Sequence, residues 1–201
     1  DIFDLASISK VVATTSAIMK MYDDKLIDLD DKVVSYLPQF KGRQKKYFNH
    51  KSNITIKHLL QQSSGLDYPE FSFHPLSEFN QLMLGEDVTK MTLLQTAYRK
   101  PNELFEYNGV NPQNLGLLLQ RAYGKRYADL LSEKLWQKIA QDDASVVLDS
   151  KENKMPRTYC CLNATARDWL RIGIIMLNEG QFNEKQIVPK SWIKEMKNIQ
   201  K

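Results

Sequence analysis

The chain has 201 residues, of which 42% are apolar and 26% are charged. This length is enough for one domain with a hydrophobic core, and this composition is ordinary for a globular protein. The net charge is +4 and most basic residues are scattered, so we expect no nucleic-acid surface. The longest uncharged stretch is interrupted by Thr and Ser, so we expect no membrane span.

The most informative segment runs from Leu5 to Met19, where Lys10 is the one charged residue. This segment has the length of a helix, apolar residues on every side and no Pro or Gly, which predicts a helix packed all round. Lys10 would then be a buried amine. Removing an ammonium from water disfavours its charged form, so a buried Lys10 is able to accept a proton near neutral pH.

Ser7 precedes Lys10 by three residues, and positions three apart share one face of a helix. This spacing pairs a weak nucleophile with a base that activates it, at a helix start whose free N–H groups favour an oxyanion. The structural alternative is that Ser7 caps the helix and Lys10 extends to solvent. The same spacing recurs at Ser191 and Lys194, on an amphipathic segment that predicts a solvated lysine.

One run of basic residues follows the first helix. Its members are Lys41, Arg43, Lys45, Lys46, His50 and Lys51. The run is polar and lies between two better-patterned segments, which predicts a solvated loop rather than a nucleic-acid patch.

Capping residues and apolar periodicity predict further helices. Thr55 caps the first of these, and its His58 is expected to be a hydrogen-bonded packing residue rather than a base. Four predicted helices cover residues 56–64, 89–99, 112–124 and 127–139. A fifth begins at a cap, Asn163 or Thr165, and ends at Gly180, and a sixth begins at Pro189. Residues 67–86 predict a loop with one helical turn over a cleft, and residues 145–148 are the one short strand expected.

The two cysteines, Cys160 and Cys161, are adjacent and cannot join distant parts of the fold. Such a pair forms either a strained vicinal disulfide or two reduced, packed thiols, and we expect the thiols. No His or acidic residue stands near them at metal-ligand spacing. We therefore expect no metal site and no cofactor.

A series of short motifs follows in order along the chain. They are residues 3–10 (FDLASISK), residues 29–31 with 36–38 (LDD and YLP), residues 54–60 (ITIKHLL), residues 63–66 (SSGL), residues 105–107 (FEY) and residues 115–116 (LG). Together they resemble the serine β-lactamase and penicillin-binding-protein family, in its class C and esterase-like branch. Residues 159–168 are most similar to aminohexanoate-oligomer hydrolase and esterase relatives.

The resemblance implies a mostly helical chain, with the helical domain and nucleophile helix of a β-lactamase/transpeptidase-like α+β fold. It implies that residues 1–201 are a single, incomplete domain whose sheet-forming N- and C-terminal strands are largely missing, and that the native N-terminus precedes Asp1. The implied function is a serine hydrolase that forms an acyl-enzyme with esters, amides or peptides, β-lactams among them. A periplasmic, lipid-anchored or secreted location is implied as well.

By the same resemblance, Ser7 is the acylated nucleophile, Lys10 its base and Tyr107 the proton relay to the leaving group. The family usually has Asn or Ser two residues after this tyrosine, where the present chain has Gly109. Asn108 or Asn111 would replace that side chain, so Asn108 and Gly109 are the candidate substrate-binding residues.

A second departure concerns the oxyanion hole. Relatives carry a Lys-Thr-Gly or His-x-Gly strand well after the position of Trp192, and this chain ends at Lys201. No strand is expected after Leu148 to reach Ser7 with a second oxyanion donor, so we expect residues 1–201 alone to turn over esters poorly or not at all. With no strand to cover the first helix either, we expect an exposed apolar patch. Its members are Ile8, Val11, Val12 and Ile18.

The rival function is a noncatalytic relative that binds peptidoglycan-like peptides or a partner without turnover. The missing strand and Gly109 favour this rival. The buried Lys10 argues against it, because an uncompensated amine in an apolar helix costs stability without structural return.

Overall fold

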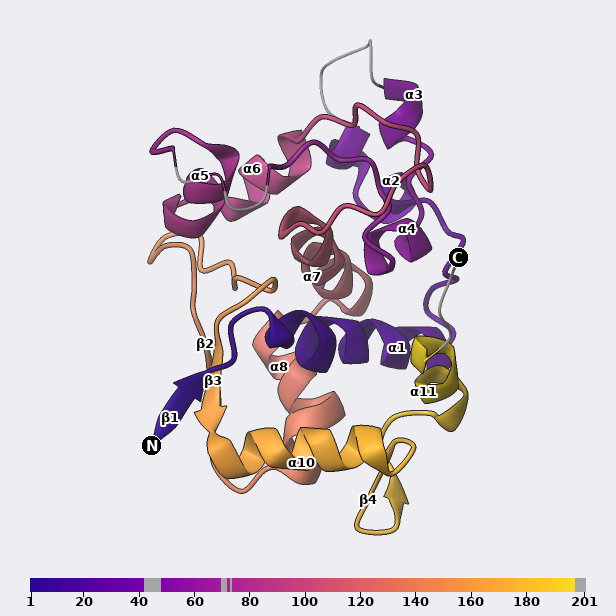
Figure 1. Ribbon diagram of the computed structural model, residues 1–201, viewed down its shortest axis with the longest axis vertical. Coiled ribbons are helices and arrows are strands. Elements are labelled where there is room, and N and C mark those ends of the chain that lie inside the picture. Colours follow the sequence, from indigo (N-terminus) through magenta and orange to yellow (C-terminus); the bar gives the residue numbers. More distant parts are fainter. Residues whose placement is uncertain (42–47, 70–71, 73, 198–201) are drawn as a thin grey trace.

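The computed structural model describes residues 1–41, 48–69, 72 and 74–197. It is mostly helical, which confirms the predicted fold class (Figure 1). The helical segments are η1 (Lys10–Thr15), α1 (Ser16–Asp23), α2 (Val33–Tyr36), η2 (Pro38–Lys41), α3 (Phe48–Lys51), α4 (Ile56–Leu60), α5 (Glu78–Leu84), α6 (Val88–Leu94), α7 (Val110–Tyr123), α8 (Tyr127–Leu131), η4 (Ser132–Trp136), α9 (Gln137–Ile139), α10 (Ala166–Leu177) and α11 (Lys190–Lys197). The strands are β1 (Ile2–Asp4), β2 (Ser145–Val146), β3 (Leu162–Thr165), β4 (Gln181–Phe182) and β5 (Lys185–Gln186).

The first helix, formed by η1 and α1 in succession, crosses the middle of the molecule (Figure 1). Both parts pack against α7, and α1 also packs against η4. Helices α2 to α6 lie on one side of the first helix in this view, and α10, α11 and the strands lie toward the other. The packing of this central helix fixes the position of the residues that directly precede it.

Two small antiparallel sheets complete the fold. One has the order β1-β3-β2, with Ile2 opposite Thr165 and Ser145 opposite Asn163, and the other pairs β4 with β5. Strand β2 confirms the short strand expected at residues 145–148, but the expectation that it would be the one strand was wrong. Strands of two to four residues are too short for an alternating pattern to be recognised in the sequence.

The first helix is not buried on all sides. Val12 and Ile18 are 7% and 0% exposed because they face the core, whereas Ile8 and Val11 are 54% and 45% exposed. Positions 8 and 11 are three residues apart and so share the outer face. The predicted apolar patch is thus confirmed for Ile8 and Val11 and wrong for Val12 and Ile18.

Several predicted helix ends are found in the structure. The Thr55 side chain accepts from the His58 N–H, and the His58 ring accepts from the Thr55 N–H at 3.0 Å, so both predictions are confirmed. Thr165 caps α10 by accepting from the Asp168 N–H, and Asn163 lies within β3 instead. Gly124, with φ of +64°, ends α7 as predicted.

Other helix ends differ from the prediction. Helix α4 ends at Leu60 rather than at residue 64, and α6 ends at Leu94 rather than at residue 99. Helix α7 begins at Val110, before the predicted cap Asn111. Loop contacts across the chain, described below, account for the early end of α4 and the early start of α7.

The basic run is only partly described, since residues 42–47 lie outside the described part of the chain. Lys51, at its end, contradicts the prediction of a solvated loop because only 3% of it is exposed. Its ammonium donates to the carbonyls of Leu93 at 2.6 Å and Gln95 at 2.5 Å, and lies 4.5 Å from the centroid of the Phe40 ring. Burial lowers the pKa of Lys51 to about 7.

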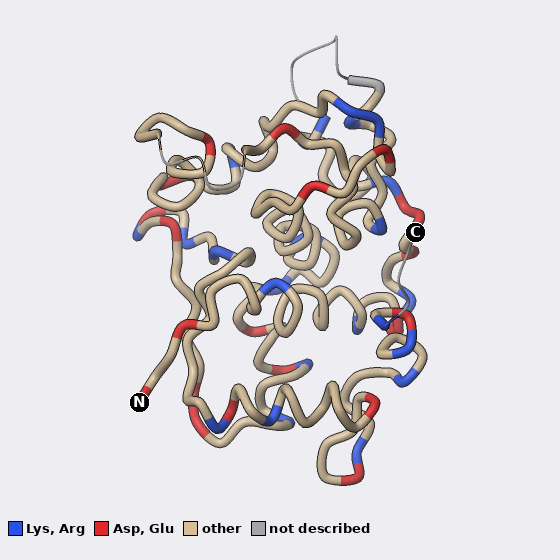
Figure 2. The backbone as a smooth tube through the Cα atoms, in the orientation of Figure 1, with Lys and Arg blue, Asp and Glu red and all other residues tan. Residues whose placement is uncertain are grey.

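Charged residues of both signs are spread along the outer segments rather than gathered on one face (Figure 2). No helix in the described part of the chain is long and apolar enough to cross a membrane. Nor do three or more His, Cys, Asp or Glu side chains among the described residues converge as a metal site requires.

Candidate active site

A tight turn between β1 and the first helix carries Ser7. The Asp4 carboxylate accepts from the Ala6 N–H at 2.7 Å, and Ala6 has φ of +44°. Positive φ is uncommon for a residue with a side chain, and such backbone strain collects at functional sites. The turn leaves Ser7 exposed on the surface, immediately before the first helix.

Lys10 joins the two other residues that the resemblance singles out. Its ammonium donates to Ser7 Oγ at 2.9 Å and to Tyr107 Oη at 2.8 Å, and its side chain is only 7% exposed. Tyr107 lies 97 residues away in the sequence. The structure therefore brings Ser7, Lys10 and Tyr107 into one hydrogen-bonded chain. The second Ser-x-x-Lys pair has both residues exposed, as predicted.

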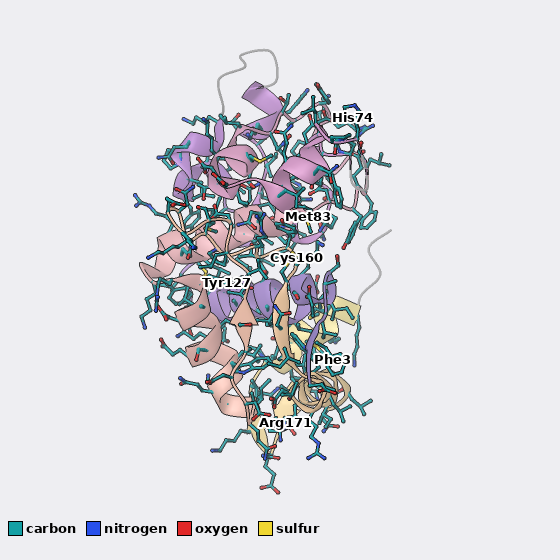
Figure 3. All side chains as sticks on the ribbon, turned by 90° about the vertical axis from the view of Figure 1, so that its left-hand side faces the viewer. Phe3, His74, Met83, Tyr127, Cys160 and Arg171 are labelled. Atoms are coloured by element: carbon teal, nitrogen blue, oxygen red, sulfur yellow. A yellow bond between two sulfur atoms is a disulfide. The ribbon has the colours of Figure 1, made fainter. Side chains whose placement is uncertain are left out.

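The helix that carries Lys10 is anchored through buried polar contacts. Thr14 Oγ1 donates to the Thr158 carbonyl at 2.6 Å and lies 3.1 Å from the Tyr127 hydroxyl. Figure 3 shows Tyr127 beside the first helix, and burial raises its pKa. These contacts hold the helix one turn beyond the Lys10 side chain.

The two candidate substrate-binding residues have structural contacts. Asn108 is 1% exposed, and its Oδ1 accepts from the Asn111 N–H, in the first turn of α7, at 2.9 Å. A Cβ atom added to Gly109 would lie 3.2 Å from Leu82 Cδ2 and 3.4 Å from Tyr159 Cδ2. Close packing thus accounts for glycine at this position. A role for Asn108 or Gly109 in substrate binding stays a prediction.

Cys160 and Cys161 form a disulfide, so the expectation of reduced thiols was wrong. Cys161 has φ of +69°, a backbone turn that the sequence pattern did not indicate. Figure 3 shows Cys160 at mid-height in the molecule, between Met83 and Phe3. Cys160 and Cys161 are 7% and 8% exposed, so the disulfide is buried rather than a surface link.

The strand that follows the disulfide reaches the turn of Ser7. The Leu162 N–H lies 3.4 Å from Ser9 Oγ, and the Leu162 carbonyl lies 3.5 Å from the Leu5 nitrogen. Leu5 and Ser9 flank Ser7 on either side. The expectation that no strand after Leu148 approaches Ser7 was therefore wrong.

A hydroxyl, an amine and a phenol in one chain can pass a proton from Ser7 to Lys10 and on to Tyr107. Within the described part of the chain, no hydrogen bond engages the backbone N–H of Ser7. This N–H is open to an oxyanion that forms on a substrate bound at Ser7 Oγ.

An exposed serine precedes the central helix, a buried lysine follows that serine by one turn, and a tyrosine from a distant loop contacts that lysine. This arrangement defines the class of serine β-lactamases and penicillin-binding proteins. The sequence profile described as Beta-lactamase matches residues 1–199. The chain belongs to this family, which confirms the resemblance.

Named relatives agree with this assignment. Protein flp of Staphylococcus aureus (strain MW2) is 31% identical over 139 residues, which are 69% of this chain and 26% of that protein. Penicillin-binding protein 4* of Bacillus subtilis (strain 168) is 26% identical over 148 residues, or 72% of this chain and 30% of that protein. The chain thus spans well under half the length of these relatives.

Solved structures agree as well. The one named "Putative 6-aminohexanoate-dimer hydrolase from Bacillus anthracis" has a TM-score of 0.85 and 27% identity, and covers 100% of this chain and 54% of its own. A family VIII carboxylesterase has a TM-score of 0.74 and covers 97% of this chain and 60% of its own. At 18% identity, the second likeness concerns the fold alone.

Proposed function

We propose that this chain carries the acyl-transfer centre of a serine hydrolase that acts on esters, amides or peptides. The observation that carries the proposal is the contact of the Lys10 ammonium with Ser7 Oγ at 2.9 Å and with Tyr107 Oη at 2.8 Å. Similarity to a structure named as an aminohexanoate-dimer hydrolase supports the same reaction class.

Acylation begins when Ser7 Oγ attacks the substrate carbonyl carbon and its proton passes to Lys10, which is neutral at that moment. The carbonyl electrons move to oxygen, and the Ser7 N–H donates to the oxyanion. Collapse of the tetrahedral intermediate expels the leaving group, which takes the Tyr107 hydroxyl proton. Lys10 then returns the proton it holds to Tyr107.

Deacylation reverses the proton path. Water attacks the acyl carbon, and its proton passes through Tyr107 to Lys10. Ser7 Oγ leaves as the ester bond breaks, and it takes the proton from Lys10. The enzyme is restored and the acid is released, with no further reactant needed.

The buried position of Lys10 supports turnover over the rival of a noncatalytic binder. Its amine costs stability where it is, and its two side-chain partners can both exchange protons.

The test is intact-mass measurement after incubation with a fluorophosphonate and, separately, with a penicillin, followed by peptide mapping. We expect one adduct, located on Ser7, and none in the Ser7→Ala variant. Ser191→Ala is the matched control, because it removes the serine of the second Ser-x-x-Lys pair, and it should be labelled fully. An adduct on Ser9, Ser63 or Ser191 would refute the assignment, and reversible peptide binding without any adduct would support the noncatalytic rival.

A further inference from the structure

The loop that carries Tyr107 has little side-chain packing on its N-terminal side. Leu104 and Phe105 are 50% and 68% exposed, although both are large apolar residues. Glu106, next to Tyr107, forms an ion pair with Arg99 in which both side chains are partly exposed, and a segment held by exposed contacts moves more readily than the helices beside it. The position of the Tyr107 hydroxyl therefore depends on how the backbone next to it is held.

Both neighbours of Tyr107 donate backbone hydrogen bonds to the same residue, Gln62. The Glu106 N–H donates to the Gln62 carbonyl at 2.8 Å, and the Asn108 N–H donates to Gln62 Oε1 at 3.2 Å. The main chain and the side chain of Gln62 thus hold the loop on either side of Tyr107.

The backbone of Gln62 is shaped for this contact. Gln62 follows the end of α4 and has φ of +55°, a left-handed conformation that is uncommon for a residue with a side chain. This turn ends α4 early and directs both Gln62 acceptors to the Tyr107 loop. Such conformations persist where the surrounding structure fixes them.

Buried partners fix the Gln62 side chain in turn. Gln62 Oε1 also accepts from Asn111 Nδ2 at 2.7 Å, and Asn111 Oδ1 accepts from the Ser64 hydroxyl at 2.6 Å. Asn111 and Ser64 are 0% and 1% exposed. The Gln62 side chain is therefore held by the first turn of α7 rather than by solvent-exposed groups.

We infer that Gln62 is a positioning residue that holds Tyr107 in register with Lys10. The inference rests on the proposed function, because it assigns Gln62 to the proton relay of that reaction. Gln62 acts on the relay through the backbone on either side of Tyr107. A proton relay depends on placement, and a displacement of about 1 Å can cost on the order of 10²-fold in rate.

The test compares Gln62→Met with wild-type protein on two butyrate esters, p-nitrophenyl butyrate and ethyl butyrate. Methionine keeps the length of the side chain but removes the acceptor. The ethyl ester needs a proton on its leaving group and the nitrophenyl ester does not, so the rate constant of acylation, measured in single turnovers, should fall on the order of 10-fold or more for the ethyl ester alone. Gln62→Glu keeps an acceptor oxygen and should restore most of the loss.

Gln61→Met is the matched control, because Gln61 lines a separate surface groove with Val11 and Thr15. This variant should match the wild-type protein on both esters. In a Tyr107→Phe background, Gln62→Met should cause no further loss, since the relay is already absent. Circular dichroism and thermal unfolding report whether each variant is folded.

The outcomes separate this inference from the function on which it rests. If wild-type protein forms no Ser7 adduct, the proposed function fails and the inference fails with it. If Ser7 is acylated but Gln62→Met slows acylation by both esters equally, or adds its full loss to Tyr107→Phe, the proposed function stands and the role of Gln62 is overturned.

Discussion

Lys10 and Lys51 are the two buried lysines in the described part of the chain, and they meet different kinds of partner. Lys10 is 7% exposed and donates to the side-chain hydroxyls of Ser7 and Tyr107. Lys51 is 3% exposed and donates to the main-chain carbonyls of Leu93 and Gln95. A hydroxyl can give or take a proton, whereas a carbonyl only accepts a hydrogen bond.

This difference shows that burial alone does not make a lysine chemically active. Lys51 joins the chain before α4 to the end of α6 through two carbonyls, which is a structural task. Lys10 joins two groups that can exchange protons with it. The kind of partner, rather than the loss of solvent, therefore separates the proposed base from the structural lysine.

The largest effect is expected for Ser7→Ala. Without the hydroxyl there is no nucleophile and no acyl-enzyme, so the rate of ester hydrolysis should fall by on the order of 10³-fold or more. Steady-state kinetics with an aryl ester measure this loss. A Lys51→Met variant, compared per folded molecule, should keep the full acylation rate. Equal losses in the two variants would contradict the distinction between Lys10 and Lys51.

Tyr107→Phe should have the next largest effect on activity. It removes the hydroxyl that passes a proton to the leaving group, while Ser7 and Lys10 keep their contact. We expect the rate constant of acylation to fall on the order of 10²-fold with alkyl esters and to change little with nitrophenyl esters. Rates on matched pairs of esters measure the split, and an equal loss on both would contradict the relay role.

Lys51→Met should affect stability rather than acylation. It leaves the carbonyls of Leu93 and Gln95 without their donor, and a buried acceptor left unpaired costs about 1–3 kcal/mol. Urea unfolding should therefore show a lower free energy of unfolding. A variant as stable as the wild-type protein would show that these two hydrogen bonds contribute nothing.

The pH dependence of stability is the most specific test of the role of Lys51. Burial lowers the pKa of Lys51 to about 7, below the value of about 10.4 expected in the unfolded chain. Between these values the unfolded state binds more protons, so the free energy of unfolding should rise as the pH increases from 7 toward 10. Urea unfolding at pH 7, 8 and 9 should show this rise in wild-type protein and a weaker one in Lys51→Met. Equal slopes would contradict the role of Lys51.

Local patterns in the sequence predicted part of this picture. The apolar run around Lys10 indicated its burial, and the spacing of Ser7 and Lys10 indicated their contact. The caps at Thr55 and Thr165 and the helix end at Gly124 also depend on neighbouring residues alone. Such features can be predicted because every group that determines them lies within a few positions of the chain.

Features that depend on distant segments could not be predicted in this way. Lys51 lies in a basic run, and the carbonyls that accept its hydrogen bonds are 42 and 44 residues further along the chain. Gln62 contacts Asn108 across 46 residues, and nothing near Gln62 indicates that loop. The disulfide depends on the left-handed backbone of Cys161, which no local residue pattern requires.

The most direct test of the central claim is the acylation rate of Ser7 in Lys10→Arg and Lys51→Arg, measured side by side by intact mass with a fluorophosphonate. Arginine keeps the positive charge but does not deprotonate near neutral pH. We predict that Lys10→Arg folds and is not acylated, whereas the folded fraction of Lys51→Arg is acylated at the wild-type rate. Full acylation of Lys10→Arg would contradict the account, because the contact of Lys10 with Ser7 would then be structural, like the contacts of Lys51.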